Sequence, residues 1–148
     1  MGAYGLLTMY NFKAQIGVSK TQDTYTYADL AEGFDNVTES LNEVVQQYQF
    51  LSDGGFAKNH VTGMAPSFTL TGRRVFGDTA QDYIFSKKYG LDADRQSSFK
   101  LTFNNGTEDV TYTCNCTICN IQEFGGASTE DAAISVEIRL DGQPTKAA

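Results

Sequence analysis

Tryptophan is absent from the sequence, histidine occurs once, and no long hydrophobic run is present. A membrane-spanning helix needs ~20 mostly apolar residues, so the sequence predicts no such span. Residues 1–12 have no basic segment ahead of their short apolar patch, which argues against a secretory signal. The lack of tryptophan also weakens a carbohydrate-binding interpretation, although eight tyrosines remain as possible platforms.

Cysteine is scarce, and its three copies are clustered at Cys114, Cys116 and Cys119. An odd number in one short stretch does not fit a disulfide framework. A zinc site would need a fourth ligand and a catalytic cysteine would need a histidine partner, but the single histidine, His60, is distant in sequence. We therefore interpret the thiols as small apolar residues of a strand, and we predict no metal and no cofactor.

Positive charge is also in short supply. The net charge of −7 argues against non-specific binding to nucleic acid or to an anionic membrane. Arg73 and Arg74 form the one basic pair, which is either solvated or part of a salt bridge across a subunit contact. Phosphate-binding loops and hydrolase motifs are missing, and the acidic pairs at 92–94 and 130–131 fit solvated loops better than a cation site. We predict no catalytic residues and no enzyme activity.

Alternation of apolar and polar residues is the dominant pattern and predicts strands. Asn105-Gly106 is a strong hairpin signal between two of these strands. A change of parity near residues 118–119 predicts a bulge. The predicted strands cover residues 12–18, 24–30, 66–71, 99–103, 107–121 and 134–140.

One helix is predicted between Gly77 and Gly90. Asp78 is a suitable N-cap, and Gln81 lies three residues later, where its side chain can reach back toward the cap. Gly90 is placed to end the helix in the left-handed conformation. Apolar pairs at i,i+4 spacing indicate that the helix packs against a sheet.

Residues 38–51 fit both a helix and a strand, and their composition slightly favours a strand. Residues 56–65 are interpreted as a long polar loop, so that 43–75 becomes two strands with an extended connection. A loop of this length is usually functional or an interaction arm. Residues 1–11 are expected to be an irregular lead-in and 142–148 a mobile polar tail.

The predicted fold class is mainly β with one flanking α-helix, in a single domain over residues 1–148. One helix covers only part of the sheet surface, so we expect two antiparallel sheets to pack on each other as a sandwich or barrel. Open sheet edges then need cover from neighbouring subunits. The pattern therefore favours a subunit of an assembly.

Three segments carry a resemblance to a known family. They are NEVVQQYQFLSDGGFAKNHVTGMAPSFTLTGRRV, the helix FGDTAQDYIFSKKYGL directly after it, and the closing pair SSFKLTFNNGTEDVTYTCNCTICNI and DAAISVEIRL. Over about residues 10–142 the sequence resembles the tail tube proteins (major tail proteins) of long-tailed bacteriophages. It is similar also to the inner tube proteins of contractile tails and injection systems.

The resemblance implies a β-sandwich subunit that assembles into hexameric rings, which stack into a hollow tube for genome delivery. Neighbouring subunits would close each other's sheet edges. The implied partners are further copies of the chain, a tape-measure protein, tail terminator and baseplate proteins, and double-stranded DNA in transit without specific binding. No membrane binding is implied. The implied location is the virion tail, assembled in the bacterial host cytoplasm.

The resemblance also implies roles for particular segments. The connection at about 51–65 would reach the adjacent ring, with the lead-in and the tail as further contacts. A lumen of neutral and negative side chains would repel DNA phosphates. The candidate contact residues are Phe50, Asp53, Gly54, Gly55, Phe56, Asn59, His60, Arg73 and Arg74. The candidate lumen residues are Glu43, Gln47, Gln49, Thr69 and Thr71.

Three alternatives stay open at the level of sequence. The first is an inner tube protein of a contractile tail or bacteriocin-like injection system, which shares the fold. The second is a stand-alone β-sandwich binding module. The third is a metal- or thiol-dependent enzyme built on the three cysteines.

Overall fold

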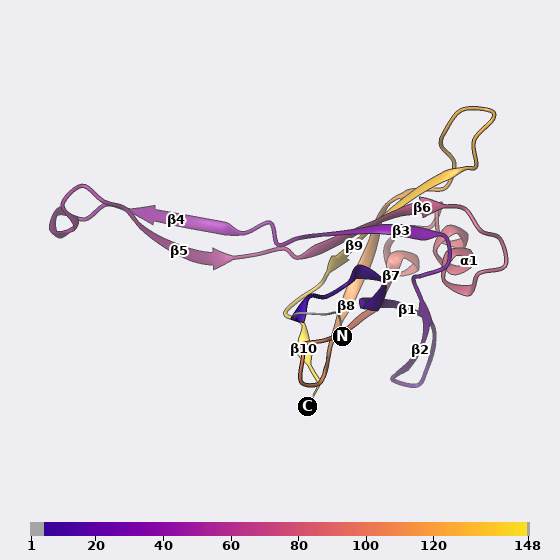
Figure 1. Ribbon diagram of the computed structural model, residues 1–148, viewed down its shortest axis with the longest axis horizontal. Helices are drawn as coiled ribbons and strands as arrows, with labels where there is room; N and C mark the ends of the chain where they lie inside the picture. Colours follow the sequence, from indigo (N-terminus) through magenta and orange to yellow (C-terminus); the bar gives the residue numbers. More distant parts are fainter. Residues whose placement is uncertain (1–4, 148) are drawn as a thin grey trace.

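The structure is a computed structural model that describes residues 5–147, and it consists of a curved β body from which a long hairpin projects (Figure 1). The strands are β1 (Lys13–Thr21), β2 (Thr24–Asp29), β3 (Phe34–Ser40), β4 (Val44–Tyr48), β5 (Lys58–Gly63), β6 (Ser67–Arg73), β7 (Gln96–Asn104), β8 (Asp109–Gln122), β9 (Ala133–Leu140) and β10 (Thr145–Lys146). The helix is α1 (Thr79–Ser86), and the short 3₁₀ turns are η2 (Met9–Asn11), η3 (Leu51–Asp53) and η4 (Asp92–Arg95).

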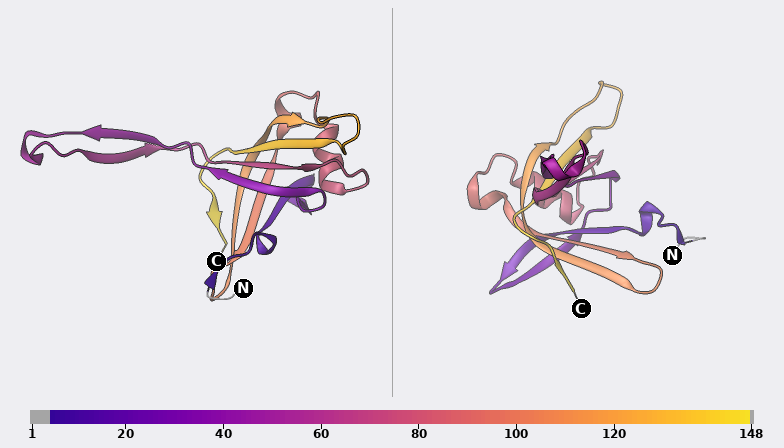
Figure 2. Two further views of the ribbon diagram at one scale, coloured as in Figure 1. Left: turned by 45° about the horizontal axis from the view of Figure 1, so that its top comes forward. Right: turned by 90° about the vertical axis from the view of Figure 1, so that its left-hand side faces the viewer.

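One antiparallel sheet forms the body, with strand order β2-β1-β7-β8-β9-β6-β3 and with β10 added beside β8. The sheet bends until its apolar faces meet, as Figure 2 shows. The ring of Phe68 on β6 lies 5.1 Å from the ring of Phe99 on β7 (centroid to centroid), although β8 and β9 separate these strands within the sheet. The mainly-β fold with one helix is confirmed. The two expected sheets are parts of a single sheet.

The core lies inside this bend, and its residues come from the predicted apolar faces. Those faces alternate with polar ones because successive strand residues point to opposite sides. The strands predicted around 12–18, 24–30, 66–71, 99–103, 107–121 and 134–140 are confirmed. The most deeply buried core residues are Ile16, Leu70, Ala80, Ile84, Phe99, Cys116, Ile118, Val136 and Ile138.

The predicted start of α1 at the N-cap Asp78 is confirmed, but the Gln81 side chain does not reach back to that cap as predicted. The Asp78 carboxylate accepts a hydrogen bond from the Gln81 backbone N–H (3.1 Å) and caps the helix. The Gln81 side chain is buried and does not return to the cap. Its amide donates to the carbonyls of Glu32 and Arg73, and its oxygen accepts from Val75 N–H. Gln81 thus joins the helix to the β2–β3 turn and to the end of β6.

The predicted end of the helix at Gly90 is wrong. The helix ends at Ser86, and Gly90 does not adopt the left-handed conformation. The physical reason is a side chain: the Arg95 guanidinium donates to the carbonyls of Lys88 (2.6 Å), Gly90 (3.1 Å) and Ile118 (3.0 Å). After Ser86 the backbone closes tighter i→i+3 hydrogen bonds, such as Lys88 N–H to the Phe85 carbonyl (3.3 Å) and Gly90 N–H to the Lys87 carbonyl (3.0 Å). The Arg95 contacts hold the chain in this turn, in place of a left-handed cap. In the described residues, no helix is long and apolar enough to cross a membrane.

Two further details of the β7–β8–β9 region agree with the sequence. The hairpin turns at Asn105-Gly106 through a four-residue loop, which the Asn105 N–H closes on the Glu108 carbonyl (3.0 Å). The register between β8 and β9 shifts between Cys119 and Gln122, where Asn120 has φ +51°. The predicted bulge is therefore confirmed, slightly beyond residues 118–119.

Two loop predictions and the mobile tail are wrong. Residues 31–36 have the Gly, Asp and Asn composition that predicts a loop, yet strand β3 begins inside them. Strand β5 lies inside the predicted loop 56–65. Both strands expose most of their side chains, so they lack the alternation that marks a half-buried strand. The tail pairs with β8 as β10, and the Ala147 N–H donates to the Thr111 carbonyl (2.8 Å). The parts of the lead-in and tail at 1–4 and 148 lie outside the described residues.

Candidate functional site

The most unusual feature is the projecting hairpin of β4 and β5, which we call the arm and define as residues 41–65 (Figures 1 and 2). None of its residues is buried. The predicted loop 51–65 is only its second half, because the arm begins earlier, with β4. The register pairs Val45 with Val61 and Gln47 with Asn59, so the arm is a regular antiparallel ladder.

The arm continues the strands of the body at its base. The Ala65 N–H donates to the Leu41 carbonyl (2.9 Å), which carries the β3–β6 pairing toward the arm. Asn42 adopts φ +47°, and its side-chain amide donates to the Ala65 carbonyl (2.9 Å). Its side-chain oxygen accepts from the Ser40 hydroxyl (3.0 Å). These contacts fix the junction on both strands.

The tip of the arm is held by a single carboxylate. Asp53 accepts a hydrogen bond from the Phe50 N–H (3.0 Å) and forms a salt bridge with Lys58 (3.1 Å). Gly54 and Gly55 follow in the left-handed region (φ +62° and +89°), which glycine adopts without strain. The local sequence therefore specifies the turn.

The tip presents apolar side chains to solvent. We define the apolar tip as Phe50, Leu51 and Phe56, all exposed; Leu51 is fully exposed and Phe56 is 80% exposed. The Phe50 ring stacks on Tyr48 at 5.7 Å between centroids. Exposed apolar groups that gather on a projecting element are typical of an interaction site.

A second apolar surface lies at the base of the arm. It is a groove of about 680 Å³ at the open end of the bent sheet, which we call the basal groove. Residues from both ends of the chain, from the arm base and from the five strands β3, β6, β7, β8 and β9 line it. The lining residues are Leu7, Met9, Phe12, Val37, Glu39, Leu41, Met64, Pro66, Phe68, Leu101, Phe103, Tyr112, Leu140, Gln143 and Pro144.

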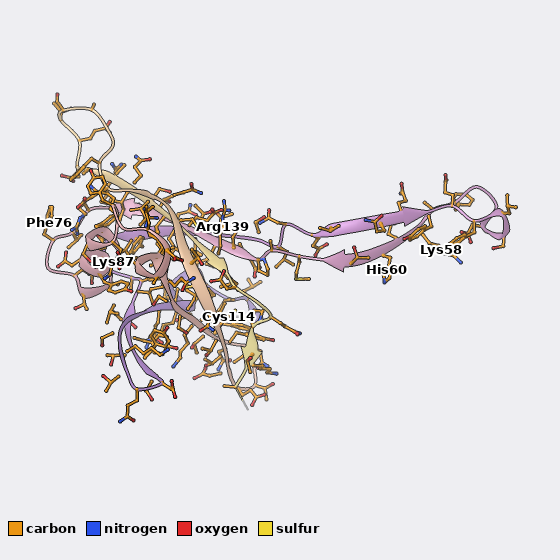
Figure 3. The ribbon with its side chains drawn as sticks, turned by 180° about the vertical axis from the view of Figure 1, so that it is seen from behind. Lys58, His60, Phe76, Lys87, Cys114 and Arg139 are labelled. Atoms are coloured by element: carbon orange, nitrogen blue, oxygen red, sulfur yellow. The ribbon has the colours of Figure 1, made fainter. Side chains whose placement is uncertain are left out.

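The predicted contact residues fall into two distant groups. Those from Phe50 to His60 lie on the arm, whereas Arg73 and Arg74 lie at the end of β6 near α1. Figure 3 shows Lys58 and His60 at one end of the molecule and Phe76 at the other. The structure therefore does not bring the nine residues together.

The salt bridges of Arg74 are within the chain. Its side chain is only 6% exposed and pairs with Glu123 (2.9 Å) and Asp82 (3.2 Å). Lys88 approaches the other oxygen of Glu123 (2.5 Å). Arg73, in contrast, is exposed and donates to the Asp131 carbonyl (2.8 Å). Arg74 thus stabilises the helix end of the body.

The electrostatics of this cluster favour an ionised Glu123. Burial alone would raise the pKa of its carboxyl. The hydrogen bonds and positive charges of Lys88 and Arg74 outweigh that effect and hold the pKa below its ordinary value of 4.5. The carboxylate therefore remains charged at neutral pH and ties the β8 end to α1.

The predicted lumen residues also separate. Glu43, Gln47 and Gln49 belong to the arm, whereas Thr69 and Thr71 lie on the outer face of β6. That face of the bent sheet is rich in hydroxyls, and we call it the polar face. Its threonines are Thr38, Thr69, Thr71, Thr102, Thr111, Thr113 and Thr117.

The cysteines lie along β8, far from the only histidine. Cys114 and Cys116 are buried, Cys119 is half-buried, and all three are free thiols. Burial raises the pKa of each thiol, which disfavours the reactive thiolate. Figure 3 shows His60 on the arm and Cys114 in the body. Within residues 5–147, no three His, Cys, Asp or Glu side chains are placed to hold a metal ion.

The described body sheet ends in two unpaired edges. Strands β2 and β3 end the sheet order, and no described strand pairs with their outer edges. Open edges present free N–H and C=O groups that can pair with another chain. Open edges follow from the strand pattern of the sequence, but the basal groove does not, because its residues are spread along the chain. The apolar patch in the lead-in was its only local signal.

Comparison of the sequence finds no matching protein-family model and no matching characterised protein. The fold, however, matches solved structures over nearly the whole chain. The tail of an empty gene transfer agent particle, solved with C6 symmetry, has a TM-score of 0.69 at 14% identity. The match covers 100% of this chain and 99% of that one. The virion of a native gene transfer agent gives 0.72 at 14% identity, covering 97% and 100%.

An extracellular contractile injection system, solved as a sheath–tube complex in the extended state, is also similar. Its TM-score is 0.60 at 15% identity, and the match covers 99% of this chain and 94% of that one. The chain therefore has the fold found in these tail and tube assemblies. The predicted resemblance is confirmed at the level of fold.

Proposed function

We propose that the protein is a structural subunit of a tail tube, which polymerises as stacked hexameric rings into a hollow conduit for genome delivery. The observation that carries the proposal is the end-to-end fold match with tail structures, which covers 97–100% of this chain. A match of this extent leaves no additional domain in the described chain to supply another function. The open edges of β2 and β3 and the exposed arm support self-association independently.

Each surface has a part in this proposal. The edges of β2 and β3 pair with neighbouring copies around a ring, because paired edges satisfy their backbone groups. The arm, with contact residues from Phe50 to His60, reaches a copy in the adjacent ring. The polar face, which contains Thr69 and Thr71, lines the conduit. Its hydroxyls lie among charges of both signs, in which Lys13 pairs with Asp29 and Arg139 with Glu137. Interspersed charges of this kind favour sliding of DNA over specific binding.

The remaining parts of the proposal follow from this role. The location is the virion tail, assembled in the bacterial host cytoplasm, and the protein is not an enzyme. Its partners are other copies of itself, a tape-measure protein, and tail terminator and baseplate proteins. DNA passes through without specific binding. The similarity to tail structures and the raised pKa values of the thiols support this non-catalytic role.

Negative-stain electron microscopy of the purified protein tests the function directly. We expect rings with six-fold symmetry, or hollow tubes, at concentrations at which the chain is folded by circular dichroism. A folded chain that shows neither rings nor tubes over a wide range of concentration and salt would contradict the proposal.

The inner tube of a contractile tail is the second candidate. The similarity to the tube of a contractile injection system favours it, although that TM-score (0.60) is below those of the gene transfer agent structures. Co-purification with a sheath protein encoded nearby would favour this candidate. Assembled tails without a sheath would exclude it.

A further inference from the structure

We propose that Asn105 is a deamidation site, and that Asn104 slows its conversion by holding the backbone N–H of Gly106. The modification needs only water as a co-reactant. It turns the Asn105 side chain into aspartate or isoaspartate and releases ammonia. The contacts that govern it lie within one chain, so the site does not depend on the proposed function.

Asn105-Gly106 is the only Asn-Gly step in the sequence. In the reaction, the Gly106 backbone nitrogen attacks the Asn105 Cγ, the bond from Cγ to Nδ2 breaks, and the proton of the attacking nitrogen leaves with the ammonia. Water then opens the succinimide ring at either carbonyl, which restores the N–H and gives aspartate or isoaspartate. Glycine favours the attack because it has no Cβ in the way. Both residues are exposed in a loop, where local opening costs little free energy.

The attacking nitrogen is engaged in the folded hairpin. The Gly106 N–H donates to the Asn104 Oδ1 (2.8 Å). The nitrogen must turn from Asn104 toward the Asn105 side chain before it can attack, so this hydrogen bond has to break first. The hairpin therefore opposes the reaction at the nucleophile.

The carbonyl under attack, in contrast, is already polarised. The Asn105 Oδ1 accepts hydrogen bonds from the backbone N–H groups of Thr107 (3.0 Å) and Glu108 (2.9 Å). Two backbone donors on one carbonyl oxygen are the arrangement that stabilises the oxyanion formed on nucleophilic attack. The bond from Gly106 to Asn104 is thus the contact that keeps a favourable pair of reacting groups apart.

Asp109 orients the Asn104 side chain for this role. The Asn104 Nδ2 donates to the Asp109 Oδ1 (3.0 Å) across the β7–β8 pair. A carboxylate accepts hydrogen bonds and an amide nitrogen donates them, so the Asn104 oxygen is the atom left to face the Gly106 N–H. Asp109 is therefore a positioning residue, which acts through Asn104.

Conversion would change the hairpin in two ways. Both products place a new carboxylate near Glu108 and Asp109, so the net charge becomes one unit more negative than −7. Isoaspartate also adds one carbon to the main chain inside the loop that the Asn105 N–H closes on the Glu108 carbonyl (3.0 Å). Because loop length fixes hairpin register, the added carbon disturbs the pairing of β7 with β8.

A rate measurement on the folded full-length chain tests the role of Asn104. The protein is incubated in mildly alkaline buffer, and peptide mapping by mass spectrometry follows aspartate and isoaspartate at position 105. Asn104→Ala should make deamidation of Asn105 about fivefold faster or more, as expected for the loss of one hydrogen bond. Urea unfolding followed by circular dichroism checks that the variant is folded during the incubation.

Two controls separate the folded-state contact from other effects. In concentrated urea the bond to Asn104 is absent from both proteins, so wild type and Asn104→Ala should react at equal rates. Gln15→Ala removes a comparable exposed bond, to Asp29 (2.8 Å), outside the β7–β8 loop and should leave the rate at Asn105 unchanged. A difference that persists in urea, or an equal acceleration by Gln15→Ala, overturns the proposal.

An exchange of two side chains is the sharper test. Asn104→Asp combined with Asp109→Asn reverses donor and acceptor between the two positions but keeps an oxygen at position 104 for the Gly106 N–H. The folded double variant should stay as slow as wild type, whereas Asp109→Ala, which leaves Asn104 unoriented, should react faster. A double variant as fast as Asn104→Ala overturns the proposal.

The remaining outcomes are equally decisive. Equal rates for folded wild type and folded Asn104→Ala overturn the role of Asn104. No conversion of Asn105 in either buffer or urea overturns the site itself. Both results leave the tail-tube function intact, because rings and tubes are observed independently by electron microscopy.

Discussion

The body and the arm are built from strands of similar composition, yet they use their apolar residues in opposite ways. Strand β6 buries Phe68 and Leu70 inside the bent sheet. Strand β4 carries Val44, Val45 and Tyr48, all exposed. Burial of apolar area stabilises the body within one chain. The same kind of area in the arm is only about half covered, since Val44, Val45 and Tyr48 stay 44–50% exposed, so it stabilises the chain less.

The sharpest test of this contrast compares one substitution at two leucines. Leu70 has no exposed surface, so Leu70→Ala should destabilise the fold by about 2–5 kcal/mol through lost burial and a cavity. Leu51→Ala removes a fully exposed side chain and should change the unfolding free energy by less than about 0.5 kcal/mol. Urea unfolding followed by circular dichroism measures both. Similar losses at the two positions would contradict the contrast.

Two carboxylates allow the same comparison for charge. Glu123 is 11% exposed in the body and bonds Arg74 and Lys88. Glu123→Gln should therefore destabilise the fold at neutral pH by about 1–2 kcal/mol. Asp53→Asn in the arm can still accept the hydrogen bond from the Phe50 N–H and loses only the charge pairing with Lys58, whose side chain is 67% exposed. The unfolding free energy should therefore change by less than about 0.5 kcal/mol.

The effect of Glu123→Gln should depend on pH in a defined direction. The folded-state pKa of Glu123 is below its ordinary value of 4.5, so its contribution is fully present above pH 4.5. The contribution is lost as the pH falls through the folded-state pKa. The gap in unfolding free energy between wild type and Glu123→Gln should therefore close below pH 4.5. A gap that is constant from neutral to acid pH would show that the ionised form is not the stabilising one.

The cap of α1 should contribute less. Asp78→Ala removes the hydrogen bond to the Gln81 N–H and should cost about 1 kcal/mol in unfolding free energy. Asp78→Asn, which can still accept that bond, is the matched control and should recover most of the loss. Thermal unfolding of both variants gives the measurement, and equal losses would count against a capping role.

Removing the arm should have the smallest effect on folding. Replacing residues 42–64 with a short turn deletes no buried side chain, so the melting temperature of the body should be nearly unchanged. Assembly observed by electron microscopy should be lost. A body that unfolds without its arm would show that the two parts do not differ as the burial pattern indicates.

The body was predictable from sequence because its strands are buried on one face. Ile134, Val136 and Ile138 alternate with polar residues and lie in the core as expected. The arm was predictable only in part, since β5 faces solvent on both sides and so has no alternation. The sequence predicted the turn at Gly54 and Gly55, but it did not predict that β4 and β5 pair on either side of that turn.

Long-range contacts account for the other differences. Arg95 bonds the carbonyls of Lys88 and Gly90 and holds the chain after α1 in a turn, where the local sequence predicted a left-handed end at Gly90. The last strand, β10, pairs with the first half of β8, which no local pattern could reveal in so short a polar segment. The basal groove combines residues from both chain ends with residues from five strands, so only the folded chain defines it.

The continuity of the arm with the body also has a mechanical meaning. β3 leads into β4, and β5 leads into β6, with the ladder fixed at the junction by Asn42. A pull on the tip is therefore transmitted along β6, which is bonded to β3 on one side and to β9 on the other. Antiparallel hydrogen bonds run perpendicular to the strands, so such a load shears many bonds at once instead of opening them one by one. The base of the arm is therefore secured along the length of β6 and not by a single contact.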